Sequence, residues 1–75
     1  MRLSEAKTGC YYEVIKVEGS GPVKRRFMDL GLVSKTRLKV VRLAPLGDPI
    51  EVEVRGYNLS IRKDEASLVI VREVS

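Results

Sequence analysis

Three consecutive cations, Lys24, Arg25 and Arg26, stand together in the sequence. Side chains of this kind recognise acidic groups and do not by themselves make or break bonds. They lie in the first half of a predicted helix, where each positive charge opposes the helix macrodipole by about 0.3 kcal/mol. Local helix stability therefore does not explain them. Asp29, at i+4 from Arg25 and i+3 from Arg26, can pair with part of the charge. The remainder indicates either a solvated face or a docking surface for an acidic partner.

Met28 and Leu32 stand next to this cluster and can extend it with apolar surface. Met28 lies about 100° round the helix from Phe27, and Leu32 follows Gly31, which is expected to end the helix. Each of the two can belong to the core or lie outside it. Outside, they would form a contact patch, because methionine adapts to irregular surfaces and interface centres are apolar and enriched in arginine. The set expected to bind a partner is Lys24, Arg25, Arg26, Met28 and Leu32.

Residue types that serve catalysis or metal binding are scarce. The chain has no histidine and one cysteine, Cys10, so the commonest general base and transition-metal ligand is missing. The stretch GSGPVK lacks the glycine spacing and the Lys-Ser/Thr ending of a phosphate loop. A specific iron site is not expected, because no nitrogen ligand or second thiolate joins the carboxylates of Asp48, Glu51, Glu53, Asp64 and Glu65. The sequence predicts no catalytic, metal or cofactor-binding residue and a protein that is not an enzyme.

Size and charge narrow the class further. The chain has 75 residues, with 14 Lys and Arg against 10 Asp and Glu, and a net charge of +4. A basic surplus favours acidic partners, whether nucleic acid, an anionic membrane face or an acidic protein. A chain of this length maintains one core, so residues 1–75 are expected to form a single domain. No apolar run reaches the roughly 20 residues that span a bilayer, and the first residues lack the apolar block of a signal peptide. We expect a cytoplasmic protein that does not insert into the membrane, with a monomer favoured.

Nucleic acid is the competing partner class. Small basic barrels bind it through a charged face interleaved with aromatic residues, and Tyr11, Tyr12 and Tyr57 could stack on bases. Tyr11 and Tyr12 are adjacent, however, and point to opposite sides of a strand. Acidic and basic residues also alternate on the same predicted strands. The sequence therefore indicates a mixed surface and favours a protein partner over nucleic acid.

One helix stands out by its change of hydrophobic period. Val23, Phe27 and Leu30 lie at i, i+4 and i+7 and share one helical face, which predicts that they face the core. Pro22 suits the first turn of this helix, after an N-cap at residue 20 or 21, and Gly31 suits the left-handed residue that ends it. These signals predict a short amphipathic helix from residue 22 to residue 30.

Apolar and polar residues alternate in the segments on either side of this helix, as they do in strands. The alternation breaks at Val40–Val41, which indicates a strand covered on both faces or a bulge that bends it. KDEA fits a single helical turn, RGYN fits a turn, and the residues before Gly9 form a short polar lead. The predicted strands are 11–17, 36–43, 50–54, 59–61 and 68–71. Five short strands with one helix between the first and second predict a mainly β protein, a small five-stranded SH3-like barrel.

Three stretches resemble the FeoA family, the small cytoplasmic component of bacterial ferrous iron uptake. They are FMDLGLVSKT, LKVVRLAPLGDPIEVEVRGYNLSIRKDEA and the closing LVIV, and the similarity covers nearly the whole chain, including the opening LSEAKTG. The most specific pieces are residues 29–32, 44–49 and 59–66. One departure concerns a turn: the family typically has a Pro-Gly pair before Thr36, where this chain has Ser34 and Lys35. The conformation of this turn is therefore left open.

The resemblance implies a fold and a partner. It implies an SH3-like barrel that works in the cytoplasm with the membrane protein FeoB, whose soluble portion carries a GTPase domain, and it does not imply catalysis. Domains of the same type are also fused to iron-responsive repressors, but no DNA-reading element precedes this one. The sequence thus predicts a non-catalytic accessory protein that docks on the cytoplasmic part of the FeoB transporter and modulates its assembly or activity. The alternative is a small basic barrel that binds nucleic acid.

Overall fold

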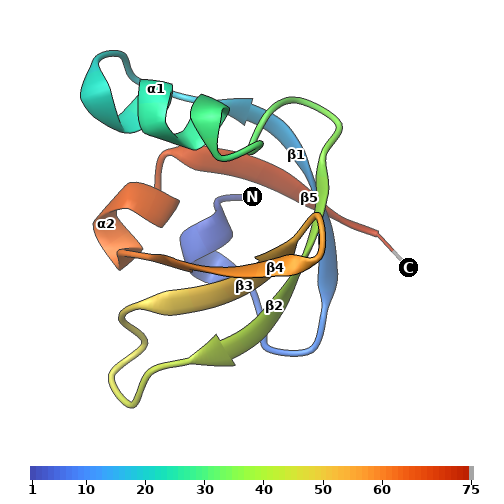
Figure 1. Cartoon of the computed structure of the whole chain (residues 1–75). Coiled ribbons are helices and arrows are strands. Elements are labelled where there is room, and N and C mark those ends of the chain that lie inside the picture. Colours follow the sequence, from blue (N-terminus) through green and yellow to red (C-terminus); the bar gives the residue numbers. More distant parts are fainter. Residues whose placement is uncertain (75) are drawn as a thin grey trace.

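The protein folds into a small five-stranded SH3-like barrel with a short helix between its first two strands, as predicted (Figure 1). The computed structural model describes residues 1–74. All neighbouring strands are antiparallel, in the order β4-β3-β2-β1-β5. The elements are η1 (Leu3–Glu5), β1 (Tyr11–Val17), α1 (Pro22–Asp29), β2 (Arg37–Leu43), β3 (Ile50–Val54), β4 (Tyr57–Ile61), α2 (Lys63–Ala66) and β5 (Val69–Val74).

Strand alternation builds the core. Tyr12 is 1% exposed and its neighbour Tyr11 is 50% exposed, so the two rings lie on opposite sides of β1, as predicted. Each valine or leucine buried in this way contributes about 1.5–3 kcal/mol relative to leaving it in water. The strand residues of the core, apart from Tyr12, are Val14, Val17, Leu38, Val40, Ile50, Val52, Val54, Ile61, Val69 and Val71.

The break in alternation on β2 is a bulge. The register of the β2–β3 pair shifts between Val40 and Arg42, at the position where the sequence loses its parity. A second shift, between Val14 and Lys16 on β1, was not predicted. Bulges increase the local twist and bend a strand, which lets five short strands curve around one core.

Both ends of the described chain carry more structure than predicted. The opening residues are not a polar lead: Leu3 is fully buried in η1, and Met1 pairs with Val71 of β5, whose N–H donates to the Met1 carbonyl at 2.8 Å. The N-terminus thus covers part of the β5 edge. β5 itself continues to Val74, because its last residues pair with Tyr11 and its neighbours on β1.

The β3–β4 connection is a two-residue hairpin and shorter than the predicted RGYN turn. Val54 and Tyr57 are paired, so Arg55 and Gly56 alone form the loop and Tyr57 begins β4. Both loop residues have positive φ, 52° for Arg55 and 85° for Gly56. This is the conformation of a type I′ turn, whose twist matches that of the flanking strands.

The Ser34–Lys35 turn, left open by the sequence, is now defined. The N–H of Thr36 donates to the carbonyl of Val33 at 3.0 Å, and Lys35, the third residue of the turn, has a φ of 75°. Positive φ at this position is typical of a type II turn, which favours glycine there. Lys35 therefore adopts a conformation that its side chain disfavours.

Replacement of Lys35 by glycine should stabilise the protein. Relief of the left-handed strain gains about 1–2 kcal/mol, and the extra freedom of glycine in the unfolded chain removes about 0.4–1 kcal/mol of that gain. A net gain of about 0.5–1 kcal/mol should raise Tm by about 2–8 °C in circular-dichroism melting. Ser34→Gly is the matched control and should lower Tm, because Ser34 does not have positive φ. A lower Tm for Lys35→Gly would contradict the assigned turn.

Within residues 1–74, neither helix has the length and apolar character needed to cross a membrane.

Candidate functional site

The outer face of α1 is the candidate docking surface. Phe27 is fully buried, and Val23 and Leu30 pack partly buried against the core, so the apolar stripe of α1 faces inward as predicted. Met28, one residue further round the helix, is 53% exposed. We use the name α1 outer face for Lys24, Arg25, Met28 and Asp29, which line one shallow hollow together with Ser20 and Gly21.

The charges of this face are free to meet a partner. Among residues 1–74 the ion pairs are Arg2–Glu18, Arg26–Glu65, Arg42–Glu51 and Arg72–Glu13. Arg25 and Asp29 therefore make no ion pair within the described chain, and the predicted pairing of Asp29 along the helix is not present. The face carries two cations and one carboxylate around an exposed methionine.

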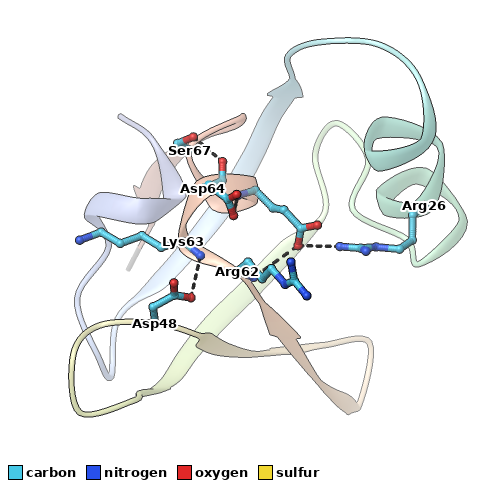
Figure 2. A network of polar contacts seen from close by, with 7 residues as sticks. Arg26, Asp48, Arg62, Lys63, Asp64 and Ser67 are labelled. Atoms are coloured by element: carbon cyan, nitrogen blue, oxygen red, sulfur yellow. Dashed lines mark hydrogen bonds and ion pairs between the residues drawn. The ribbon is translucent and has the colours of Figure 1, made fainter.

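Arg26 has a different role from its two neighbours. Its Nη2 donates to Oε1 of Glu65 at 2.7 Å (Figure 2). Its guanidinium carbon lies 5.3 Å from the centroid of the Phe27 ring. Glu65 belongs to α2, so this contact joins the two helices. Arg26 thus holds α1 in place in this structure, in addition to being a candidate contact residue.

The α2 turn connects α1 to the β2–β3 loop. The backbone N–H of Lys63 donates to Oδ1 of Asp48 at 3.0 Å, while Glu65 binds Arg26 on the other side of the turn (Figure 2). Ser67 closes the turn by donating from its hydroxyl to the carbonyl of Asp64 at 2.5 Å. These contacts fix the position of α1 relative to the barrel without using the α1 outer face.

Leu32 corrects one part of the expected patch. The sequence left core and surface open for it and included it in the set expected to bind a partner, but it is fully buried in the core. Gly31, with a φ of 92°, turns the chain back after the helix, and the N–H of Leu32 donates to the carbonyl of Phe27 at 2.9 Å. Leu32 therefore packs inward behind Phe27 and has no surface to offer. Of the expected residues, Lys24, Arg25 and Met28 remain together on one face.

Glu13, Glu18, Glu51 and Glu65 form ion pairs with arginines. Glu51 binds Arg42 at 3.4 Å and accepts a hydrogen bond from Nδ2 of Asn58 at 2.9 Å. Within the described residues, no three His, Cys, Asp or Glu side chains are grouped so that they could hold a metal ion.

Among residues 1–74, two groups have a shifted pKa, and both lie outside the α1 outer face. The guanidinium of Arg2 donates to Glu18 at 2.6 Å, and this hydrogen bond lowers the pKa of Glu18. Burial raises the pKa of Tyr12, whose hydroxyl oxygen accepts the N–H of Lys7 at 2.9 Å.

A second concave surface was not predicted. A groove on the outside of the sheet is lined by Tyr11, Arg37, Leu38, Lys39, Glu53, Arg55, Gly56 and Val74. These residues come from four strands and a turn, so their proximity depends on strand register. The alternation of apolar and polar residues predicts which face of the sheet each side chain lies on. It does not predict which residues of neighbouring strands are opposite one another.

Comparison with known proteins gives consistent similarities. The family model described as FeoA domain matches residues 1–73. The chain is 37% identical over 75 residues to the Fe(2+) transport protein A/Fe(2+) transporter FeoB fusion protein of Porphyromonas gingivalis, and spans 9% of that relative's length. The solution structure of the FeoA protein of Chlorobium tepidum is 49% identical, with a TM-score of 0.92 over 100% of this chain and 71% of that one.

A crystal structure from a third organism agrees. Stenotrophomonas maltophilia FeoA, described as a prokaryotic SH3 domain protein and solved in complex with zinc, is 29% identical with a TM-score of 0.84. The match covers 96% of this chain and 89% of that one. With the family match over residues 1–73 and the shared barrel, this chain belongs to the FeoA domain family.

Proposed function

We propose that this protein is a non-catalytic accessory component of ferrous iron uptake. In this proposal it acts in the cytoplasm, docks on the cytoplasmic part of a FeoB-type transporter and modulates the transporter's assembly or activity. The observation that carries the proposal is the Porphyromonas gingivalis relative, in which an Fe(2+) transport protein A and the FeoB transporter share one polypeptide. Covalent linkage raises the effective concentration of two binding modules. A separate chain with the same partner must instead bind through a surface of sufficient affinity.

The α1 outer face supports such a contact. Lys24 and Arg25 supply positive charge, Arg25 makes no ion pair among residues 1–74, and Met28 leaves 53% of its surface in water. Arg26 anchors the helix to α2, so the face is held in one orientation before it meets a partner. Preorganisation of this kind reduces the entropy lost on binding. The chemistry fits an acidic partner surface with an apolar centre.

Binding to the purified cytoplasmic part of the FeoB-type transporter from the same source tests the proposal. Arg25→Glu combined with Met28→Asp should weaken binding at least about tenfold in isothermal titration calorimetry, which corresponds to about 1.4 kcal/mol. The matched control combines Lys7→Glu with Leu46→Asp, which also changes one exposed cation and one exposed apolar residue, away from α1. This control should bind like the unmodified protein.

Two outcomes would contradict the proposal at different levels. If both double variants bind as well as the unmodified protein, with unchanged circular dichroism, the α1 outer face is not the contact. If the unmodified protein does not bind the transporter fragment at all, docking itself is wrong.

A further inference from the structure

The groove on the outside of the sheet has the composition of a second binding surface. Its lining residues come from β1, β2, β3, the end of β5 and the β3–β4 turn. The end of β5 and the β3–β4 turn lie on the right in Figure 1, and α1 lies at the upper left. The pairing of the strands brings the lining residues together. Tyr11 of β1 is opposite Val74 of β5 and Lys39 of β2, and Lys39 is opposite Glu53 of β3. The groove has a volume of about 600 Å³.

Three cations line the groove. Among residues 1–74, Arg37, Lys39 and Arg55 take part in no ion pair. Glu53 is the one carboxylate of the lining, and although it is opposite Lys39 the two side chains make no ion pair. The lining therefore carries three positive charges and one negative charge.

Arg55 lines the groove and has an unfavourable backbone conformation. Its φ of 52° places it in the left-handed region, where a type I′ turn ordinarily uses asparagine or glycine. Its side chain lies over Gly31, so that a Cβ built on Gly31 would be 3.2 Å from the Arg55 Nε. Strained backbone conformations are concentrated at binding and active sites, so the conformation of Arg55 supports a role in recognition.

The spacing of the cations matches an extended peptide. Arg37 and Lys39 are two residues apart on β2, so their side chains point to the same side about 6.6 Å apart. Alternate side chains of an extended peptide repeat at the same distance. The exposed parts of Tyr11 and Val74 offer apolar contact to the residues between.

We propose that this groove binds an acidic, extended peptide segment of another protein, in which carboxylates alternate with apolar residues. Single-stranded nucleic acid fits less well. The lining has one aromatic ring, Tyr11, whereas single-stranded nucleic acid is bound by stacking successive bases on several rings. This inference does not depend on the proposed function of the α1 outer face.

Two-dimensional NMR of the isotope-labelled protein tests the groove with three probes. The first is a blocked hexapeptide of alternating glutamate and leucine, with three carboxylates. The second replaces its glutamates with glutamines, and the third is tetrathymidylate, with three phosphates. The acidic peptide should shift the amides of Arg37, Lys39 and Gly56, leave those of Arg25 and Met28 unchanged, and lose affinity in 0.5 M salt, because the contact is electrostatic.

Arg37→Glu should weaken binding of the acidic peptide at least about tenfold, equivalent to about 1.4 kcal/mol. Lys24→Glu, the same charge reversal on α1, should leave it unchanged. The proposal is overturned if tetrathymidylate alone shifts the groove amides, which would assign the surface to nucleic acid. Equal shifts from the neutral peptide, or no groove shifts from any probe, also overturn it. Failure here leaves the transporter-binding test unaffected, because the two tests use different probes and different residues.

Discussion

Phe27→Ala should destabilise the protein by about 3–5 kcal/mol, the usual loss when a buried phenylalanine is truncated in a core that cannot fully collapse. Phe27 is the only fully buried residue of α1 and packs in the same cluster as Leu32. Domains of this kind have about 5–15 kcal/mol of stability in total. The variant should therefore be only marginally folded, and α1 should lose its main attachment to the barrel.

Urea unfolding followed by circular dichroism measures the effect. With a slope near 1 kcal/mol per molar urea for a small domain, the midpoint should fall by about 3 M or more. Met28→Ala is the matched control from the adjacent position. Met28 is 53% exposed, so its truncation should change stability by no more than about 0.5 kcal/mol. A loss below about 1 kcal/mol for Phe27→Ala would mean that α1 is not anchored through its buried face.

The contrast between Phe27 and Leu32 shows how far helical periodicity can predict burial. Phe27 lies inside the periodic segment, so its inward direction follows from the spacing of apolar residues. Leu32 follows Gly31, where the helical geometry ends and the period no longer determines direction. Its burial depends on the φ of 92° at Gly31 and on its hydrogen bond to Phe27. Sequence suggested the glycine stop but could not give the direction of the chain beyond it.

The strands could be predicted from local sequence, but the register in which they pair could not. Alternation of apolar and polar residues predicted β1, and its break at Val40–Val41 left a bulge as one of two interpretations, because both depend on which residues face the core. The groove depends on Tyr11, Lys39 and Glu53 being opposite one another. These three residues are far apart in the chain, and their register is a property of the assembled sheet.

The candidate site shows the same limit for charged residues. Local spacing allowed Asp29 to pair with Arg25 or Arg26, whereas Arg26 pairs with Glu65, 39 residues away. Glu65, which the fold brings close, is therefore the ion-pair partner of Arg26 in place of Asp29, which is close in sequence. The sequence therefore indicated a basic helix face correctly, but could not tell which of its cations stabilises the fold and which remains free.

Gly31→Ala should destabilise the protein by about 1–2 kcal/mol, because alanine disfavours the left-handed conformation at φ 92°. The substitution carries a second cost specific to this site: the new Cβ would lie 3.2 Å from Nε and 3.3 Å from Cδ of Arg55. Gly47→Ala is the matched control, since Gly47 has a φ of 80° and no atom within 4 Å of a built Cβ.

Comparison of the two variants separates backbone strain from the Arg55 contact. In urea unfolding, Gly31→Ala should cost more than Gly47→Ala, and the difference should vanish when Arg55 is also replaced by alanine, because the crowded side chain is then absent. If Gly31→Ala lowers the free energy of unfolding equally with Arg55 present and with Arg55 replaced by alanine, Arg55 does not pack over Gly31. In that case the support for a defined Arg55 position would be lost, and the argument for an extended acidic peptide would depend on the spacing of Arg37 and Lys39 alone.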